Sequence, residues 1–135
     1  MPNPTTLRKA RQDLRQGKQP STAAGEFVHE EIEHVRHGKH GARSPKQAIA
    51  IGLNEARRAG IPLQPPKKGK TSAKTRKSAA RAYSKGQKSP ATKASPKRSR
   101  TRTAALQREP KNTASHQALS RHAHSTARKR RKKAA

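Results

Sequence analysis

The sequence contains no cysteine and no tryptophan, and it has only one Phe, one Tyr and one Met among 135 residues. The absence of cysteine excludes disulfides, thiolate zinc sites and cysteine nucleophiles. Only 27% of the residues are hydrophobic, which leaves too little apolar surface to offset the entropy of ordering the whole chain. We therefore expect at most one small domain, with extensive disorder elsewhere.

Long apolar runs are also missing from the sequence. No segment approaches the roughly 20 apolar residues that a membrane span requires. The first residues lead into no apolar stretch of the kind found in a secretory signal. These absences predict a cytoplasmic protein that does not use a membrane as a partner.

Acidic residues are scarce, with 7 Asp+Glu against 34 Lys+Arg and a formal net charge of +27. Residues 1–64 hold 11 of the basic residues and six of the acids, whereas residues 65–135 hold 23 basic residues and a single acid, Glu109. Charge of one sign at this density repels itself and requires a polyanion. Nucleic acid is the first candidate, because neutralising its phosphates releases condensed counterions.

The break in charge coincides with a Pro/Gly/Lys stretch at residues 65–70. We therefore predict a small helical unit at 1–64, a linker at 65–70 and a disordered Lys/Arg/Ala/Ser-rich tail at 71–135. Within that tail, residues 71–85, ending at Gly86, and residues 112–133 are expected to become helical when their charge is neutralised. Pro90 and Pro96 are expected to keep the segment between them extended.

The fold class predicted for the first unit is mostly α, with two to three short helices. Thr6 can cap a helix over residues 7–16, and Ser21 or Thr22 can start a second one that runs to about residue 37. Ser44, Pro45 and Gln47 form a capping box for a third helix, which Gly60 terminates. Glycines 17 and 38 suit the position after the first two helices.

The apolar residues of this unit form one stripe on the second helix and one on the third. Gly52 lies in the middle of the third helix, which predicts that the second helix approaches it closely. The predicted core is so small that the unit should be marginal or need a partner. Its members are Phe27, Val28, Ile32, Val35, Ile49, Leu53 and Ile61.

The predicted nucleic-acid contacts are the clustered basic residues of the tail. They should bind phosphates, which position a protein without specifying a sequence. Tyr83 is the only aromatic residue of the tail, so recognition by base stacking is disfavoured. The residues are Lys67, Lys68, Lys70, Lys74, Arg76, Lys77, Arg81, Lys97, Arg98, Arg100, Arg102, Arg128, Lys129, Arg130, Arg131, Lys132 and Lys133.

Two Ser-Pro segments of the tail, Ser89-Pro90-Ala91-Thr92 and Ser95-Pro96-Lys97-Arg98, offer a second way to bind DNA. A Ser-Pro turn followed by cations can enter an A·T-rich minor groove. The alternative is that Ser, Pro and Lys are merely common in this tail, and we prefer that interpretation.

Four histidines, His29, His34, His37 and His40, lie near the end of the second predicted helix. They could offer imidazoles to a metal with help from Glu30 or Glu33, but they match no recognised motif. Exposed histidines on a polar helix face are the preferred interpretation, so we predict no metal and no cofactor. The nearby acids could also hold the basic tail when nucleic acid is absent, although ordinary surface charge is the simpler account.

The sequence offers nothing that resembles an active site. It has no nucleophile with a base and an orienting group, and its glycines match no phosphate-binding fingerprint. A chain with so small a core also cannot preorganise a dry site. We therefore predict that the protein is not an enzyme.

Part of the sequence resembles a family of small, basic bacterial proteins of unknown function. The resemblance rests on the segments at 25–31, 37–53 and 56–60, above all Lys39-His40-Gly41-Ala42-Arg43-Ser44 and Gln47-Ala48-Ile49-Ala50-Ile51-Gly52. It implies a bacterial source and a Pro/Lys linker followed by a basic tail, but no activity. The tail is also similar in composition to linker-histone tails and to bacterial histone-like proteins.

These observations favour a nucleoid-associated, histone-like protein that binds DNA without sequence specificity. An RNA-binding or ribosome-associated protein is the first alternative, because phosphate contacts look alike in both. The second alternative is a helical module that binds a protein partner, or a second copy of itself, through its N-terminal helices and is tethered to nucleic acid by its tail.

Overall fold

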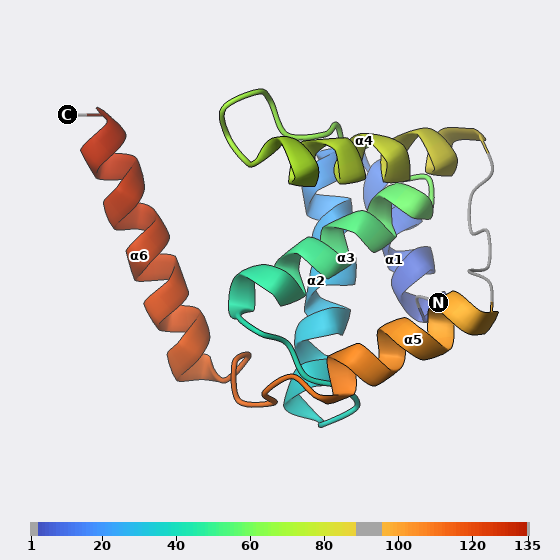
Figure 1. Cartoon of the computed structure of the whole chain (residues 1–135). Coiled ribbons are helices and arrows are strands. Elements are labelled where there is room, and N and C mark those ends of the chain that lie inside the picture. Colours follow the sequence, from blue (N-terminus) through green and yellow to red (C-terminus); the bar gives the residue numbers. More distant parts are fainter. Residues whose placement is uncertain (1–2, 89–95, 135) are drawn as a thin grey trace.

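Six α-helices make up the described part of the chain, residues 3–88 and 96–134 of a computed structural model (Figure 1). No strand occurs within these residues, so the prediction of a mostly α protein is confirmed. The helices are α1 (Pro4–Arg15), α2 (Pro20–Arg36), α3 (Pro45–Arg58), α4 (Ala73–Lys88), α5 (Pro96–Gln107) and α6 (His116–Ala134).

The first two helices begin at prolines that the sequence analysis placed outside them. Asn3, not Thr6, caps α1, because its side-chain oxygen accepts a 2.9 Å hydrogen bond from the Thr5 backbone N–H. Helix α2 begins at Pro20, one residue before the predicted Ser21. Proline suits the first helical position, since its φ is already helical and the N–H that it lacks would have no partner there.

Helix α3 begins and ends as its sequence predicts. The Ser44 hydroxyl accepts a 3.2 Å hydrogen bond from the Gln47 backbone N–H, and Gly60 closes the helix with a φ of +95°. The reciprocal half of the capping box differs slightly, because the Gln47 side chain accepts from the backbone N–H of Arg43 and not from that of Ser44.

Alanine makes up most of the core, which lies where α2 packs against α1 and α3. Phe27, Val35 and Ile61 are the largest fully buried side chains. A first cluster joins α1, α2 and α3, and a second cluster lies at the far end of α2. Of the seven predicted core residues, Val28, Ile32, Ile49 and Leu53 are only partly buried. The first cluster contains Ala10, Ala23, Ala24, Phe27, Ala56, Ala59 and Ile61, and the second contains Val35, Ala42, Ala48 and Ala114.

Small residues dominate because the helix backbones approach one another closely. A Cβ atom added to Gly52 would lie 2.6 Å from the Cα of Val28, so only glycine fits at this crossing of α2 and α3. This contact confirms the close approach predicted from the position of Gly52.

Helix α4 packs on α3, beyond the predicted end of the helical unit. Ala79 and Ala82 are buried in this contact face, and Gly86 lies against the backbone carbonyl of Arg57. The prediction that the helix ends at Gly86 is wrong, because the helix continues to Lys88 and uses this glycine for packing.

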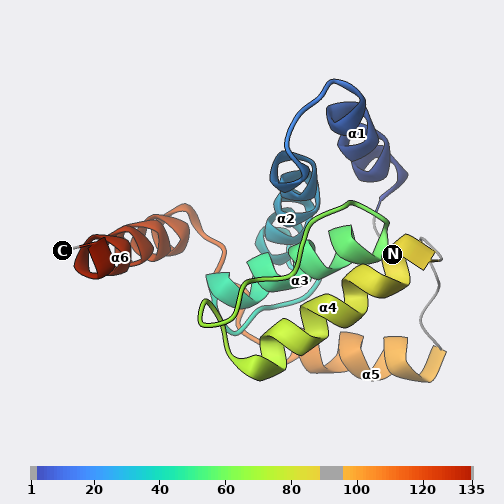
Figure 2. The same ribbon diagram turned by 90° about the horizontal axis from the view of Figure 1, so that it is seen from above.

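The tail beyond residue 95 is also helical where it is described. Pro96 is the first residue of α5, and the segment that Pro90 and Pro96 are predicted to keep extended lies outside the described residues. The extensive disorder predicted for residues 71–135 is not shown, since α4, α5 and α6 occupy most of that range. Helix α6 contacts α3 near its start and otherwise projects away from the other helices (Figures 1 and 2). Neither α5 nor α6, each described over its full length, buries a residue.

The last turn of α5 and the segment that follows it attach the tail to the body. The Gly41 N–H donates to the Leu106 carbonyl at 2.8 Å, and the Ala42 N–H donates to the Pro110 carbonyl at 2.9 Å. The Thr113 hydroxyl donates to the Ala42 carbonyl at 2.8 Å. Ala114 then completes the second core cluster, so the loop after α2 is the point where the tail docks.

Candidate functional site

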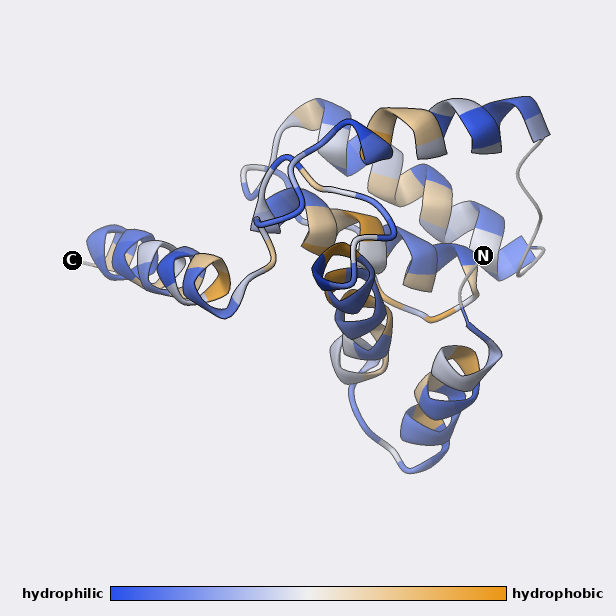
Figure 3. Cartoon of the chain, turned by 90° about the horizontal axis from the view of Figure 1, so that it is seen from below, coloured by the Kyte–Doolittle hydropathy of each residue, from blue (hydrophilic) through white to orange (hydrophobic). Residues whose placement is uncertain are grey.

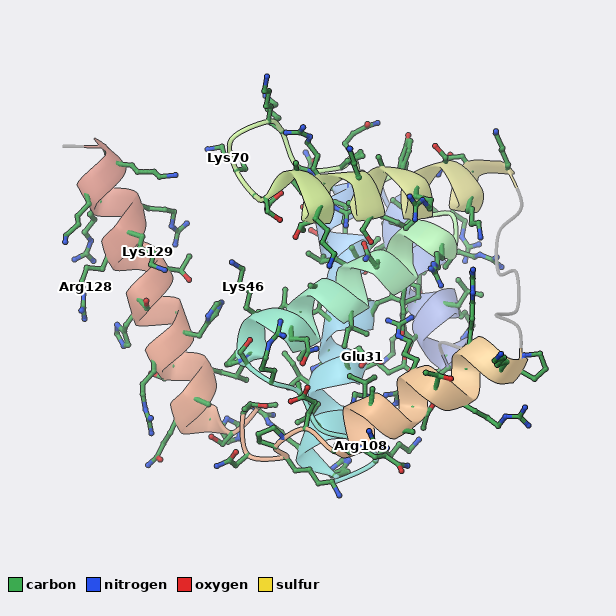
Figure 4. All side chains as sticks on the ribbon, viewed as in Figure 1. Glu31, Lys46, Lys70, Arg108, Arg128 and Lys129 are labelled. Carbon is green, nitrogen blue, oxygen red and sulfur yellow. The ribbon has the colours of Figure 1, made fainter. Side chains whose placement is uncertain are left out.

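The predicted phosphate-binding residues lie on three separate parts of the chain, which are α4 with the loop before it, α5, and α6. Lys67, Lys68 and Lys70 lie on the loop before α4, and α4 itself carries four more cations. Helix α5 carries four, and the last turns of α6 carry six in succession. All of these side chains are exposed except that of Arg76, which is half-buried. Figure 4 shows Lys70 on the loop and Arg128 and Lys129 on α6, with Arg128 on the side of that helix away from the body.

The cations of α6 surround that helix. Successive residues of an α-helix are rotated by about 100°, so the six from 128 to 133 cover its whole circumference. Figure 3 shows α6 as hydrophilic on the sides in view, apart from its first turns next to the body. The helix therefore offers positive charge in every direction.

The two predicted minor-groove turns lie at the edge of the described chain. Residues 89–92, and Ser95 of the second Ser-Pro segment, lie outside the described residues. Lys97 and Arg98 of that second segment are exposed in the first turn of α5.

The acids of α2 pair with cations of their own neighbourhood. Glu33 lies 3.3 Å from a guanidinium nitrogen of Arg36 and 3.6 Å from Nε2 of His37. Glu30 and Glu31 face His34, at 3.7 Å and 3.3 Å respectively. Glu33 thus has a charged local partner in Arg36, whereas His34 is a cationic partner for Glu30 and Glu31 only when it is protonated. The pair within α2 at Glu33 favours ordinary intramolecular pairing over autoinhibition.

The most buried acid is Glu31, whose side chain is only 4% exposed. The structure brings it together with His34 and His40, and one potential ligand atom from each residue lies within 4.8 Å of the other two. His37 does not join this group, since its side chain is 73% exposed, and His29 is exposed as well. The sequence analysis named Glu30 and Glu33 as helpers and missed Glu31. The available signal was the Glu31-x-x-His34 spacing, which places both side chains on one helix face.

Glu55, on α3, adds a second carboxyl group to this region. Burial, followed by the charge and the hydrogen bond of Glu31, raises the pKa of Glu55 to about 8. The Glu55 carboxyl is therefore mostly protonated at neutral pH, which limits the repulsion between two acids in one buried place. The sequence analysis did not identify Glu55 as part of any site.

A pocket of about 280 Å³ lies beside this cluster, between the start of α1 and the middle of α2. Glu30 and His34 line it, together with Asn3, Thr5 and Lys9 among other residues. The pocket gives solvent and small ions a path to the His34 side of the cluster.

Comparison with known families gives one match, at residues 17–68, to a family of unknown function (DUF6496). The matched segment includes α2, α3 and the loop after α3, and it contains all three segments on which the resemblance rested. The match leaves α1, α4, α5 and α6 outside, and it supplies no activity. Neither the curated proteins nor the solved structures contain a match to the chain. Among the described residues, no helix is both long and apolar enough to cross a membrane.

Proposed function

We propose that the protein binds DNA without sequence specificity, as a nucleoid-associated protein of histone-like character. One observation carries the proposal: residues 65–135 hold 23 basic residues and one acid, and beyond residue 95 most of the basic residues lie on two helices that contain no buried residue. A helix that buries no face against its own protein gains little from folding alone. Its charge suits a polyanion as the missing partner.

The shape of α6 agrees with a duplex as that partner. An α-helix with its side chains is about 10–12 Å wide, and the major groove of B-DNA is about 12 Å wide. A helix in that groove has phosphates on both sides, and the cations at 128–133 point to both. Such contacts hold the helix in place and carry no sequence information.

The proposal includes a folding step. Like charges three and four residues apart destabilise an isolated helix by about 0.2–0.5 kcal/mol per pair, and residues 128–133 hold several such pairs. In the free protein we expect α5 and α6 to exchange with disordered conformations, as the composition predicts. Binding to phosphates removes the repulsion and stabilises both helices.

The experiment that tests the proposal is a salt titration of binding to a DNA duplex and to a structured RNA of equal length. With about eight phosphate contacts, affinity should fall by roughly three to four orders of magnitude between 50 and 200 mM salt. A flat salt response would refute the proposal. A clear preference for RNA would instead support the RNA-binding alternative.

A matched pair of full-length variants tests whether DNA affinity depends on the cations of the tail or only on the net charge of the protein. The first carries Lys97→Gln, Arg98→Gln, Arg100→Gln and Arg102→Gln on α5. The second carries Arg8→Gln, Lys9→Gln, Arg11→Gln and Arg15→Gln on α1, which has the same length and four equally exposed cations. The α5 variant should bind more weakly and with a smaller salt slope than the α1 variant. Equal losses of affinity in the two variants would mean that DNA binding depends on net charge and not on the position of the cations.

The face of α3 that is lined by small residues does not support the partner-binding alternative. Ala48, Gly52 and Ala56, which line the small-residue face of α3, are buried inside the chain. That face is occupied by α2, so it does not offer a free docking site.

A further inference from the structure

We propose that Glu31, His34 and His40 form a binding site for one divalent transition-metal ion, of which Zn²⁺ fits best. The site lies at the end of α2 and in the loop that follows it, apart from the basic residues of the tail. The inference is independent of the proposed DNA binding.

The distances suit ligands that share an ion. Nδ1 of His34 lies 3.3 Å from Oε1 of Glu31, and Nε2 of His40 lies 3.1 Å from Oε2 of the same carboxylate. Ligand atoms bonded to one tetrahedral zinc at about 2.0–2.2 Å are roughly 3.3–3.5 Å apart. Glu-x-x-His is also a spacing by which helix bundles place two ligands on one metal.

One oxygen of the Glu31 carboxylate lacks a hydrogen bond in its buried place, although the Glu55 carboxyl lies near enough to interact with this carboxylate. Its Oε2 atom is buried and has no hydrogen-bond partner among the described residues, although Nε2 of His40 lies 3.1 Å away. The two atoms are close but are not aligned as donor and acceptor. Two ligand atoms that bind one metal ion are likewise close together without being hydrogen-bonded to each other. A buried carboxylate oxygen with no partner costs free energy, which a bound ion would offset.

The surroundings fix the orientation of His40, and they place a carboxylate near the outer nitrogen of His34 but beyond hydrogen-bond distance. Nδ1 of His40 lies 2.9 Å from the Gly41 carbonyl oxygen, which can only accept, so the proton belongs on Nδ1. A neutral His40 ring then has its lone pair on Nε2, the atom that faces Glu31. Nε2 of His34 lies 3.7 Å from Glu30, so a carboxylate stands behind that ring too. Outer partners of these kinds accompany most metal-bound histidines.

The ligand set selects the class of ion. Two imidazole nitrogens and one carboxylate oxygen are borderline donors, which favour Zn²⁺ and its neighbours in the transition series over Mg²⁺ or Ca²⁺. Three protein ligands leave a fourth position for water, which can arrive from the pocket beside His34.

Such an ion would fasten the loop on which the tail docks. His40 directly precedes Gly41 and Ala42, whose N–H groups donate to the carbonyls of Leu106 in the last turn of α5 and of Pro110 after it. Joining His40 to α2 through a metal would fix this loop, and with it the base of the tail.

The test uses the full-length protein, freed of metal and nucleic acid, and titrates it with Co²⁺ and with Zn²⁺. Co²⁺ should give the intense visible absorption of a four-coordinate ion at one equivalent, and Zn²⁺ should raise the melting temperature. His40→Gln, His34→Gln and Glu31→Gln should each weaken binding by roughly tenfold or more and abolish the zinc-induced shift. Circular dichroism of each metal-free variant checks that it folds.

The matched control is His37→Gln, which removes an exposed imidazole from the end of the same helix. A second control, His122→Gln with His124→Gln, removes two neighbouring imidazoles of α6. Both controls should change the affinity for the first equivalent by less than about twofold. The proposal is overturned if wild-type protein leaves Co²⁺ six-coordinate, or if His37→Gln weakens binding as much as His40→Gln. The wild-type spectrum decides the matter even if a site variant fails to fold.

Discussion

Nε of Arg36, near the end of α2, donates a 2.7 Å hydrogen bond to the carbonyl oxygen of Ala114, 78 residues further along the chain. The same guanidinium lies 3.3 Å from Nδ1 of His116, at the start of α6. One half-buried side chain therefore connects the helical body to the base of the basic tail.

Arg36→Leu should release the tail from the body. Hydrogen bonds to charged groups contribute about 1.5–3 kcal/mol, so the docked segment should open at least tenfold more often. Hydrogen exchange of the Gly41 and Ala42 amides measures this opening, because both amides donate to the docked segment. The control is Arg58→Leu, which changes an exposed arginine on α3. Unchanged exchange at both amides in Arg36→Leu would contradict the assignment.

Two glycines within helices should respond to alanine in opposite directions. At Gly52 a Cβ would collide with the backbone of Val28, so Gly52→Ala should destabilise the protein by about 1–3 kcal/mol. At Gly25, also helical, nothing lies within 4 Å of the added Cβ. Gly25→Ala should therefore stabilise by up to about 1 kcal/mol through helix propensity alone. Chemical denaturation of both variants checks the pair, and equal signs would show that the α2–α3 crossing is misassigned.

Glu55 should make the metal-free protein less stable as the pH rises. Burial, with Glu31 and Glu30 facing it, raises the pKa of Glu55 from 4.5 to about 8. Between these two values the folded state binds more protons than the unfolded state, so the free energy of unfolding falls with increasing pH. Glu55→Gln should remove this part of the slope and be more stable than wild type at pH 8. Denaturation at pH 5 to 8 in the presence of a chelator makes the comparison, and parallel slopes would contradict the prediction.

The cations of α6 should account for a large share of the salt dependence of DNA binding. A variant with Arg128→Gln, Lys129→Gln, Arg130→Gln, Arg131→Gln, Lys132→Gln and Lys133→Gln should bind duplex DNA at least tenfold more weakly at low salt. The slope of log affinity against log salt should fall by about one for each phosphate that the variant no longer neutralises. Fluorescence anisotropy at several salt concentrations measures both quantities. A variant with the wild-type slope would show that α6 does not touch the phosphates.

Local sequence signals were enough to predict α1, α2 and α3. Ser44 and Pro45 mark the start of α3, and Gly17, Gly38 and Gly60 take the positive φ angles expected after the three helices. The misplaced starts of α1 and α2 have one cause, because the analysis looked for Ser or Thr caps and passed over proline at the first helical position.

Contacts made by backbone atoms escaped the sequence analysis for a different reason. The docking of residues 106–114 on Gly41 and Ala42 uses mostly N–H and carbonyl groups, which leave no periodic side-chain pattern. Gly86 was interpreted as a helix terminator, since a glycine in a basic, low-complexity segment looks the same whether it ends a helix or packs against one. The contact between His40 and Glu31 depends on the path of the loop after α2. The spacing of residues in the sequence does not predict that path.

The family-matched segment, residues 17–68, does not contain a complete hydrophobic core. The first core cluster includes Ala10 of α1, and the second includes Ala114. Neither residue belongs to the matched segment. A fragment cut at these limits would expose Phe27 and Val35 together with the surrounding alanines. The first part of the basic tail is therefore also structural, because the segment that leads into α6 contributes Ala114 to the core of the helical body.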